Sequence, residues 1–362
     1  MPAGAPEQVV PGLQVIARSD LRYSEPMQAL LTAVAYESFG AEISRSGVDW
    51  LVMQGDGTLS DPHGAPKDRA DARPEIAWGT SDLFREAAPL VPFFAFMLES
   101  AGLAWFQSPA AGYDDLAFRR LVDKGVRVTN AHVNSLPIAE FVLRSVLDEF
   151  QEAAQWRYLA LERRWKIHDW REVSGSTWVI VGLGGIGTEV ARRAQAFGVR
   201  VIGCRRHPSP EDPTERTVTP DQLDQVLGLA DVVILAAPAT PDTDNLVNAE
   251  FLRRTKPGSL LVNVARGTLI DDNALIESLD SGHLSAAILD VFRTEPLPGD
   301  HPFWSHPSIR VTPHNAAGGV GRFQRQADLF RENLDRYLDG RPLLNDVTDA
   351  IAHPARSDPA GA

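Results

Sequence analysis

Residues Val179 to Arg206 read VIVGLGGIGTEVARRAQAFGVRVIGCRR. A short apolar run leads into a glycine-rich segment, an amphipathic segment follows, and a second apolar run closes the stretch. This order predicts a strand, a tight turn, a helix and a second, parallel strand. Such a unit is the start of a doubly wound sheet that binds a dinucleotide.

The three glycines of the pattern G-x-G-x-x-G each have a physical task. Gly182 permits the tight turn, Gly184 lets the backbone approach a pyrophosphate, and Gly187 allows the helix to pack closely on the strand. The amides of Gly185 and Ile186, at the start of the helix, are then expected to receive the phosphate charge. The alternative is a tight turn that binds no ligand.

The end of the second strand indicates which dinucleotide is bound. An NAD site usually carries an Asp or Glu here for the ribose 2′-hydroxyl. This chain has no acidic residue between Glu189 and Glu211, and the strand ends in Cys204, Arg205 and Arg206. Guanidinium groups bind a 2′-phosphate through charge-assisted hydrogen bonds. We therefore expect NADP(H), with NAD(H) tolerated if both arginines only point into water.

Bulk properties exclude several classes of protein. A chain of 362 residues exceeds the roughly 100 to 200 residues of one domain, so two domains are expected. The formal net charge of −13 opposes binding to nucleic acid or anionic lipid. Cys204 is the sole cysteine, which excludes an intramolecular disulfide, and we expect no metal site. The N-terminus lacks a secretory signal pattern and no apolar run is long enough to span a membrane, so we expect a soluble, cytoplasmic protein.

Apolar runs alternate with amphipathic segments along the chain, the pattern of parallel strands joined by crossover helices. A helix predicted from Pro137 to Trp165 separates two such series and connects two domains. A last amphipathic helix, predicted from Gly321 to Gly340, is expected to return to the first domain. The predicted strands are LQVIAR (Leu13 to Arg18), DWLVMQG, EIAWGT, LAWFQS and VRVTNA, and after the connector TWVIVG, VRVIGC, DVVILAA, SLLVNVA, LSAAILDV and IRVTP.

Polar residues follow three neighbouring strands of the second series. Arg266 comes after SLLVNVA, Asp290 and Glu295 follow the next strand, and His314 follows IRVTP. Open α/β sheets bind ligands at this edge. A histidine beside a carboxylate can give a proton to a carbonyl oxygen, and an arginine can grip a carboxylate. Each also has a structural alternative: a surface ion pair for Arg266, a turn cap for Glu295 and a structural role for His314.

Together these blocks resemble the D-isomer-specific 2-hydroxyacid dehydrogenases, in particular NADP-preferring members that reduce glyoxylate or hydroxypyruvate. The matching blocks are VGLGGIG, LAAPATPDTDNLVNAEFL, SLLVNVARGTLIDDNALIESL, AAILDVFRTEPLP and HPFWSHPSIRVTPHNAA, over about residues 75 to 345. The resemblance implies that Arg266 anchors a 2-oxo acid, His314 is the general acid or base and Glu295 supports it. It also places Asp290 near the nicotinamide carboxamide. Pro238, Thr243 and Val264 are assigned to the cofactor site.

The resemblance further implies a Rossmann domain inserted into a flavodoxin-like α/β substrate domain, and a homodimer formed through the cofactor domain. The substrate domain is expected at 1–133 with 322–350, the cofactor domain at 134–321 and a disordered tail at 351–362. Backbone contacts to the substrate are expected at Ala111 and Gly112, with Gly79 a weaker candidate; the alternative is that these small residues only form a turn. The chain departs from the family in lacking the acidic ribose residue and in carrying Gly318 and Gly319 after the histidine block.

The sequence therefore predicts an NAD(P)-dependent reductase that converts a small 2-oxo acid, such as glyoxylate or hydroxypyruvate, into a D-2-hydroxy acid. An alternative of another class is a dinucleotide-sensing scaffold of the same fold with little turnover, because fold alone does not imply activity. The substrate pocket has an alternative too. The residues Trp78, Phe93, Phe94 and Phe96 either shape a site for a bulkier 2-oxo acid or belong to the core.

Overall fold

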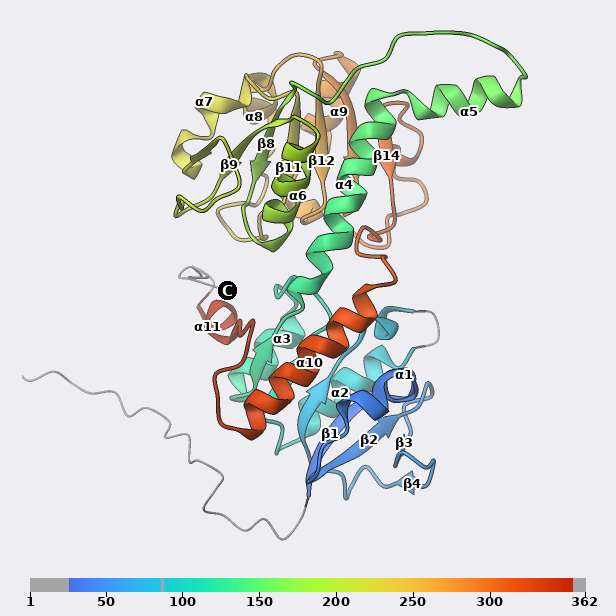
Figure 1. Cartoon of the computed structure of the whole chain (residues 1–362), viewed down its shortest axis with the longest axis vertical. Coiled ribbons are helices and arrows are strands. Elements are labelled where there is room, and N and C mark those ends of the chain that lie inside the picture. Colours follow the sequence, from blue (N-terminus) through green and yellow to red (C-terminus); the bar gives the residue numbers. More distant parts are fainter. Residues whose placement is uncertain (1–25, 86–87, 354–362) are drawn as a thin grey trace, which may run out of the picture.

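Two α/β units, each built on a seven-stranded sheet, make up the fold (Figure 1). The computed structural model describes residues 26–85 and 88–353, so the predicted strand Leu13–Arg18 lies outside the described residues. The architecture confirms the expected class, a doubly wound parallel sheet with a second α/β unit. The boundaries predicted between the two domains stay a prediction.

The first sheet has the strand order β4-β3-β2-β1-β5-β6-β7 and is parallel except at the β3 and β4 edge. β1 (Met27–Thr32) lies inside this sheet, although it was not among the predicted strands. The apolar residues of β1 continue into α1 (Ala33–Ile43) with no Gly or Pro between the two elements, so the sequence pattern does not show where the strand ends and the helix begins. The Thr32 hydroxyl caps α1 by accepting from the Ala35 N–H at 3.2 Å. The other strands are β2 (Val48–Met53), β3 (Leu59–Ser60), β4 (Pro66–Lys67), β5 (Pro74–Trp78), β6 (Trp105–Gln107) and β7 (Arg127–Thr129).

The aromatic residues of the first unit belong to its core. Trp78, Phe93 and Phe96 are buried, and Phe94 packs against the same cluster as Phe93 and Phe96. Trp78, Phe93 and Phe96 therefore belong to the core, which corrects the alternative of a bulky-substrate site for these three, whereas Phe94 is only partly buried. The short helices of this unit are η2 (Ser81–Phe84), α2 (Leu90–Glu99), α3 (Leu116–Asp123) and η3 (His132–Asn134).

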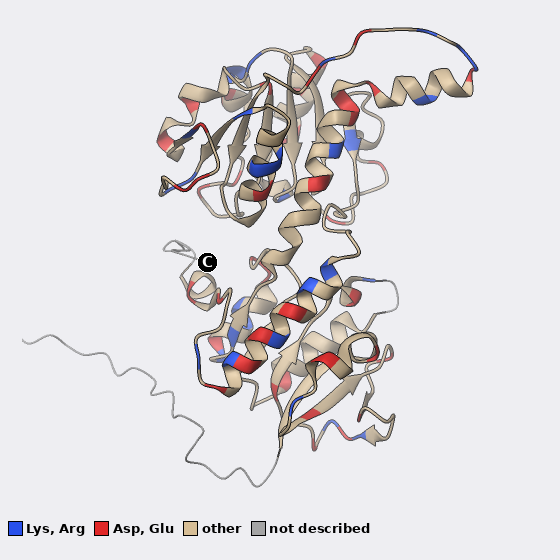
Figure 2. Ribbon diagram, viewed as in Figure 1, with Lys and Arg blue, Asp and Glu red and all other residues tan. Residues whose placement is uncertain are grey.

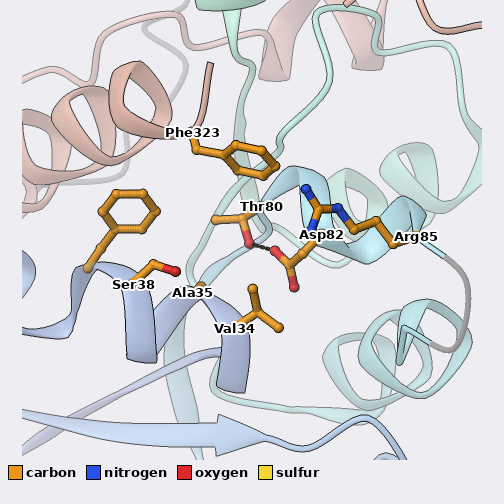
Figure 3. Close-up of a pocket in the computed structure, with 8 residues that line it drawn as sticks. Val34, Ala35, Ser38, Thr80, Asp82, Arg85 and Phe323 are labelled. Carbon is orange, nitrogen blue, oxygen red and sulfur yellow. Dashed lines mark hydrogen bonds between the residues drawn. The ribbon is translucent and has the colours of Figure 1, made fainter. Parts of the chain in front are cut away.

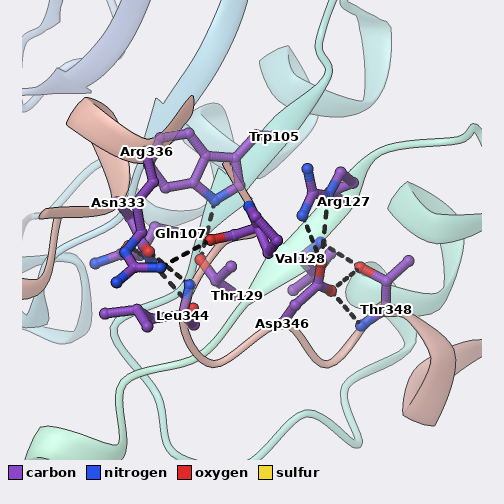
Figure 4. A network of polar contacts seen from close by, with 11 residues as sticks. Trp105, Gln107, Arg127, Val128, Thr129, Asn333, Arg336, Leu344, Asp346 and Thr348 are labelled. Atoms are coloured by element: carbon purple, nitrogen blue, oxygen red, sulfur yellow. Dashed lines mark hydrogen bonds and ion pairs between the residues drawn. The ribbon is translucent and has the colours of Figure 1, made fainter. Parts of the chain in front are cut away.

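The C-terminal segment returns to the first unit, as expected from its amphipathic pattern. In α10 (Arg322–Leu338), the Phe330 ring stacks on Trp78 with centroids 4.5 Å apart. Beyond it, Asn333 donates to the Gln107 side chain at 3.0 Å, and Arg127 pairs with Asp346 at 2.9 Å (Figure 4). These contacts connect the end of the chain to β6 and β7.

The predicted disordered tail begins too early. Residues 348–352 form α11 (Thr348–Ala352), and Ile351 is buried against the first sheet. A single apolar side chain in a short polar helix gives little sequence signal, which explains the error. The remainder of that tail, 354–362, lies outside the described residues.

The second sheet is fully parallel and contains all six strands predicted for it. Its order is β10-β9-β8-β11-β12-β13-β14. From β8 the chain first continues outward through β9 to β10, and it then returns to β11 on the other side of β8 and continues outward to β14. β10 (Arg216–Val218) is a short edge strand that was not predicted because it has little apolar character. The strands are β8 (Thr177–Val181), β9 (Arg200–Cys204), β11 (Val232–Leu235), β12 (Ser259–Asn263), β13 (Leu284–Leu289) and β14 (Ile309–Val311), and the helices are α6 (Gly185–Ala196), η4 (Pro220–Gln222), α7 (Asp224–Leu227), α8 (Ala249–Arg254), η5 (Gly267–Leu269), α9 (Asp272–Asp280) and η6 (Pro302–Trp304).

The connector is two helices, not the single helix predicted. α4 (Ser135–Phe150) packs on α6 beside the glycine-rich turn, and α5 (Ala153–Leu161) projects away from the body of the second unit (Figure 1). The break falls at Glu152, which adopts a left-handed backbone with φ of 52°. No Gly or Pro marks this position, so the sequence pattern continues across it. Among the described residues, no helix has the length and apolar character that crossing a bilayer requires.

Candidate active site

The glycine-rich turn has the geometry that its sequence predicts. Gly182 has φ of +100°, and a Cβ there would lie 2.5 Å from the Ala237 amide nitrogen. A Cβ on Gly187 would lie 1.9 Å from the Gly182 carbonyl oxygen, whereas the space around Gly184 is open to 4 Å. The turn is therefore tight, the helix lies close to the strand, and a bound group has room at the middle glycine.

Two residues that were not predicted for the site, Ser135 and His132, lie against the start of α6. A Cβ on Gly185 would lie 2.7 Å from the Ser135 hydroxyl and 3.0 Å from His132 Nδ1. Burial lowers the pKa of His132, so the neutral imidazole is favoured beside the turn. Both residues lie at the junction of η3 and α4, more than forty positions before the glycines, and no local pattern relates them to the turn.

The two arginines after β9 are in different environments. Arg205 pairs at 2.9 Å with Asp212, whose side chain is only 5% exposed, whereas Arg206 pairs at 3.2 Å with Asp242, which is 82% exposed. The first pair holds a loop together, and the second is exchangeable with solvent ions. Burial, and then the charge of Asp221, raises the pKa of the neighbouring Cys204 thiol to about 11, so this cysteine is unreactive at neutral pH.

The loop from Pro238 to Thr243, after β11, closes on itself. The Thr243 hydroxyl donates to the Pro238 carbonyl at 2.7 Å. Val264, after β12, is buried, and its N–H lies 3.3 Å from the Leu235 carbonyl. All three residues lie at the carboxyl edge of the sheet, on the same edge as the glycine-rich turn.

His314 and Glu295 form a direct pair. His314 Nδ1 lies 2.7 Å from Glu295 Oε2, and the other carboxylate oxygen accepts the Phe292 N–H at 2.9 Å. Burial raises the pKa of Glu295, but the His314 hydrogen bond, the Phe292 N–H and the nearby positive charges lower it overall. The His314 side chain is half exposed, so Nε2 is the ring nitrogen available to a ligand.

Asp290 holds the loop that carries His314. Its carboxylate accepts from the Thr312 hydroxyl at 2.6 Å and from the amides of Asn315 and Ala316 at 2.9 and 2.8 Å. Its carbonyl accepts the His314 N–H at 2.8 Å, which supports the left-handed backbone of His314. Burial raises the pKa of Asp290 despite these bonds. The predicted contact between Asp290 and a nicotinamide carboxamide stays a prediction.

Arg266 reaches across from the second unit to the first. Its Nε and Nη2 bond the two carboxylate oxygens of Asp114 at 2.8 and 2.7 Å, and Nη1 donates to the Ala265 carbonyl at 2.7 Å. Burial opposes the charged form of Arg266, but Asp114 and then Glu295 raise its pKa overall. The two pairs, Arg266 with Asp114 and His314 with Glu295, therefore lie within electrostatic range of each other.

The predicted backbone contacts separate into two groups. Gly112 lies against Arg266, since a Cβ there would be 1.6 Å from Nη2. Its neighbour Ala111 accepts the Asn130 side-chain amide at 2.7 Å. Gly79 donates its N–H to the Gln107 carbonyl at 2.9 Å, which leaves no N–H for a substrate. The expected contact of Gly79 with substrate stays a prediction, and it would require this amide to leave the Gln107 carbonyl.

A hollow lies at the carboxyl ends of β1 and β5, and β5 is the neighbour of β6, which leads into the Gly112 loop (Figure 3). Asp82 is buried beneath it, bonded to Thr80 and, at 2.7 Å, to the Thr32 hydroxyl. Arg85 lies over the Phe323 ring at 5.1 Å on its rim. This hollow is separate from the pairs made by Arg266 and His314.

Two α/β units, a glycine-rich turn at a helix start, and a histidine–carboxylate pair near an arginine are typical of nicotinamide-dependent oxidoreductases. The family model for the D-isomer specific 2-hydroxyacid dehydrogenase, NAD binding domain, matches residues 143–316. The chain belongs to the D-isomer specific 2-hydroxyacid dehydrogenase family, as the sequence predicted.

Individual relatives support this assignment. The chain is 33% identical to glyoxylate reductase of Thermococcus kodakarensis over 243 residues, which are 64% of this chain and 72% of that protein. It is 33% identical to D-3-phosphoglycerate dehydrogenase of Bacillus subtilis over 239 residues, 65% of this chain but only 45% of that protein. The crystal structure of a D-isomer specific 2-hydroxyacid dehydrogenase from Xanthobacter autotrophicus Py2, in complex with NADPH and MES, is 29% identical with a TM-score of 0.70, covering 90% of this chain and 98% of that one.

Proposed function

We propose that this protein reduces a small 2-oxo acid of the glyoxylate or hydroxypyruvate type to a D-2-hydroxy acid with NADPH, and with NADH less efficiently. The contact between His314 and Glu295 at 2.7 Å carries the proposal. A carboxylate on Nδ1 orients the ring and leaves Nε2 for a substrate, which suits a general acid. The glyoxylate reductase among its relatives supports the substrate class.

The glycine-rich turn is the proposed site for the dinucleotide. The open space at Gly184 and the first-turn amides of Gly185 and Ile186 fit a pyrophosphate, because such amides have no partner within the helix. Pro238, Thr243 and Val264 line the same edge of the sheet. The bound cofactor supplies the hydride for C2 of the substrate.

The protein residues then have separate tasks. Arg266 binds the substrate carboxylate and polarises the adjacent carbonyl, with the backbone of Ala111 and Gly112 alongside. His314 donates a proton from Nε2 to the carbonyl oxygen as C2 gains the hydride, so the product is a hydroxyl group and the histidine is left neutral. Glu295 keeps the ring oriented, and Asp290 keeps its loop in place.

The preference for NADPH rests mainly on Arg206. The chain offers no acidic side chain at the end of β9, and Arg206 pairs with an exposed carboxylate, Asp242. A 2′-phosphate can replace such a partner more readily than it can replace Asp212, which is buried against Arg205. Both arginines were predicted to bind the phosphate, and the burial of Asp212 favours Arg206 as the principal one.

We also propose that the enzyme is cytoplasmic and that it is a homodimer. The dimer forms through the projecting connector of the cofactor unit. Leu161, Trp165 and Ile167 are 82, 98 and 85% exposed, and large apolar side chains exposed together on one segment favour an interface. Changing both Trp165 and Ile167 to Asp should convert a dimer into a monomer in sedimentation velocity. A wild-type protein that sediments as a monomer would contradict this part.

The reaction itself is tested by identifying the product. Incubation with hydroxypyruvate and NADPH should yield D-glycerate, resolved by chiral chromatography and matched in amount by the NADPH consumed. Formation of the L isomer would exclude the assigned stereochemistry. The scaffold alternative requires an absence of product with every 2-oxo acid tested, although the assembled His314 and Glu295 pair disfavours it.

A further inference from the structure

Asp114 is the residue of the first unit that contacts Arg266 most directly. It follows β6 in the loop that contains Gly112, and it binds the guanidinium through both carboxylate oxygens at 2.7 and 2.8 Å. The two side chains are partly exposed, 30% for Arg266 and 40% for Asp114. The pair therefore links the two units at the place proposed for the substrate carboxylate.

Counting donors shows what this pair leaves for a ligand. A guanidinium has five N–H groups in a planar fork. Asp114 takes the Nε–H and one N–H of Nη2, and the Ala265 carbonyl takes one N–H of Nη1. Within residues 26–85 and 88–353, Arg266 has no other hydrogen-bond acceptor. Nη1 and Nη2 each keep one N–H group, and the edge between these two nitrogens, which Asp114 does not occupy, is one along which two oxygen atoms can bind in parallel.

We propose that Asp114 is a positioning residue: it holds Arg266 by one edge so that the opposite edge binds the carboxylate and carbonyl oxygens of the 2-oxo acid. The inference rests on the proposed function and adds a recognition residue to it. The Gly112 loop fits this arrangement, because a Cβ on Gly112 would lie 3.0 Å from Asp114 Oδ1 and 1.6 Å from Arg266 Nη2. The same bonds connect the substrate-side loop to the cofactor unit.

A competing role for Asp114 makes the opposite prediction. If its carboxylate only occupied the substrate's place on Arg266, removing the charge would improve substrate binding. If it positions Arg266, removing the charge weakens substrate recognition. The sign of the change in KM for the 2-oxo acid therefore separates positioning from competition.

The experiment compares Asp114→Asn with Asp115→Asn. Asp115 is the adjacent carboxylate, but it caps α3 by accepting the Ala117 N–H at 2.7 Å, a role that Asn fills about equally well. Both variants lose the same charge at neighbouring positions. We expect Asp114→Asn to lower kcat/KM for hydroxypyruvate roughly 10- to 100-fold, with a raised KM, since misplacing a binding group by about 1 Å has effects of this size. Asp115→Asn should stay within about twofold of the wild type, and the KM for NADPH should change in neither.

A double-mutant cycle with Arg266→Lys tests whether Asp114 acts through Arg266. Lys cannot form the forked pair, so Asp114→Asn should have little further effect in that background. Independent, multiplying effects would overturn the proposal, as would a lowered KM in Asp114→Asn or equal behaviour of the two Asn variants.

Amide hydrogen exchange of the ligand-free protein provides a readout that needs no turnover. Residues 265–269 should exchange faster in Asp114→Asn than in Asp115→Asn, because only the former releases the Arg266 loop. If the wild type reduces no 2-oxo acid, the proposed function fails and with it the recognition role, while this exchange still shows whether Asp114 holds Arg266. If the wild type is active and exchange is unchanged in Asp114→Asn, the positioning role alone fails.

Discussion

Replacing Gly112 by Ala should disable substrate recognition while leaving the fold and the cofactor site in place. The added Cβ would lie 1.6 Å from Arg266 Nη2 and 2.8 Å from Cζ. Carbon and nitrogen atoms in ordinary contact are about 3.5 Å apart, so the guanidinium has to move by roughly 2 Å. Displacement of a binding group by about 1 Å can cost 100-fold. We therefore expect kcat/KM for hydroxypyruvate to fall at least about 100-fold, a loss of roughly 2.7 kcal/mol in transition-state binding.

Steady-state kinetics with varied hydroxypyruvate at saturating NADPH measures this effect, and fluorescence titration reports NADPH binding separately. Gly102→Ala is the matched control, since the nearest atom to its Cβ, the Pro74 carbonyl oxygen, is 4.0 Å away. Both variants should bind NADPH like the wild type. If Gly112→Ala kept wild-type kcat/KM, Arg266 would not need its observed position, and the reasoning on substrate binding would be refuted.

Three other changes test the cofactor and histidine sites. Arg206→Ser should weaken NADPH binding roughly 10- to 100-fold, the worth of one charge-assisted hydrogen bond, and leave NADH binding unchanged in parallel titrations; equal loss for both cofactors would exclude a role in reading the 2′-phosphate. Asp290→Asn places a donor against the backbone N–H groups of Asn315 or Ala316, so urea unfolding should show a loss of about 1–3 kcal/mol, and an unchanged midpoint would contradict the anchoring role. The pKa of Glu295 is lowered in the folded protein, so its carboxylate stabilises the fold above the unfolded pKa of about 4.3, and that contribution is lost as the pH falls through the folded pKa. When thermal melts at neutral pH are compared with melts below the folded pKa, Glu295→Gln should therefore lose less stability than the wild type. Parallel pH curves for the two proteins would argue against the pairing.

The parts of the structure that depend on local backbone conformation and local residue pattern could be predicted from the sequence. The glycine-rich turn was predicted residue by residue because the positive φ of Gly182 and the close approach at Gly187 allow no side chain. The six predicted strands of the second sheet are buried runs bounded by clear turn residues, so their positions were predictable too.

Features that depend on distant partners could not be read in this way. Asp114 and Arg266 are 152 positions apart, and only folding reveals that the predicted substrate arginine already has a carboxylate partner. Asp212 and Asp242 meet the two arginines after β9 for the same reason. Local errors had another cause, since β1 merges with α1 and the break at Glu152 carries no Gly or Pro.

The most direct test of the account is the initial rate of NADPH oxidation, followed by near-ultraviolet absorbance, for the wild type and His314→Ala with glyoxylate, hydroxypyruvate, pyruvate and phenylpyruvate. We expect the wild type to oxidise NADPH rapidly with at least one small 2-oxo acid, and more slowly with NADH in its place. His314→Ala should bind NADPH normally but lose about 100- to 10,000-fold in rate, the usual contribution of a general acid. A wild type inactive on every 2-oxo acid, or an Ala variant as fast as the wild type, would contradict the account.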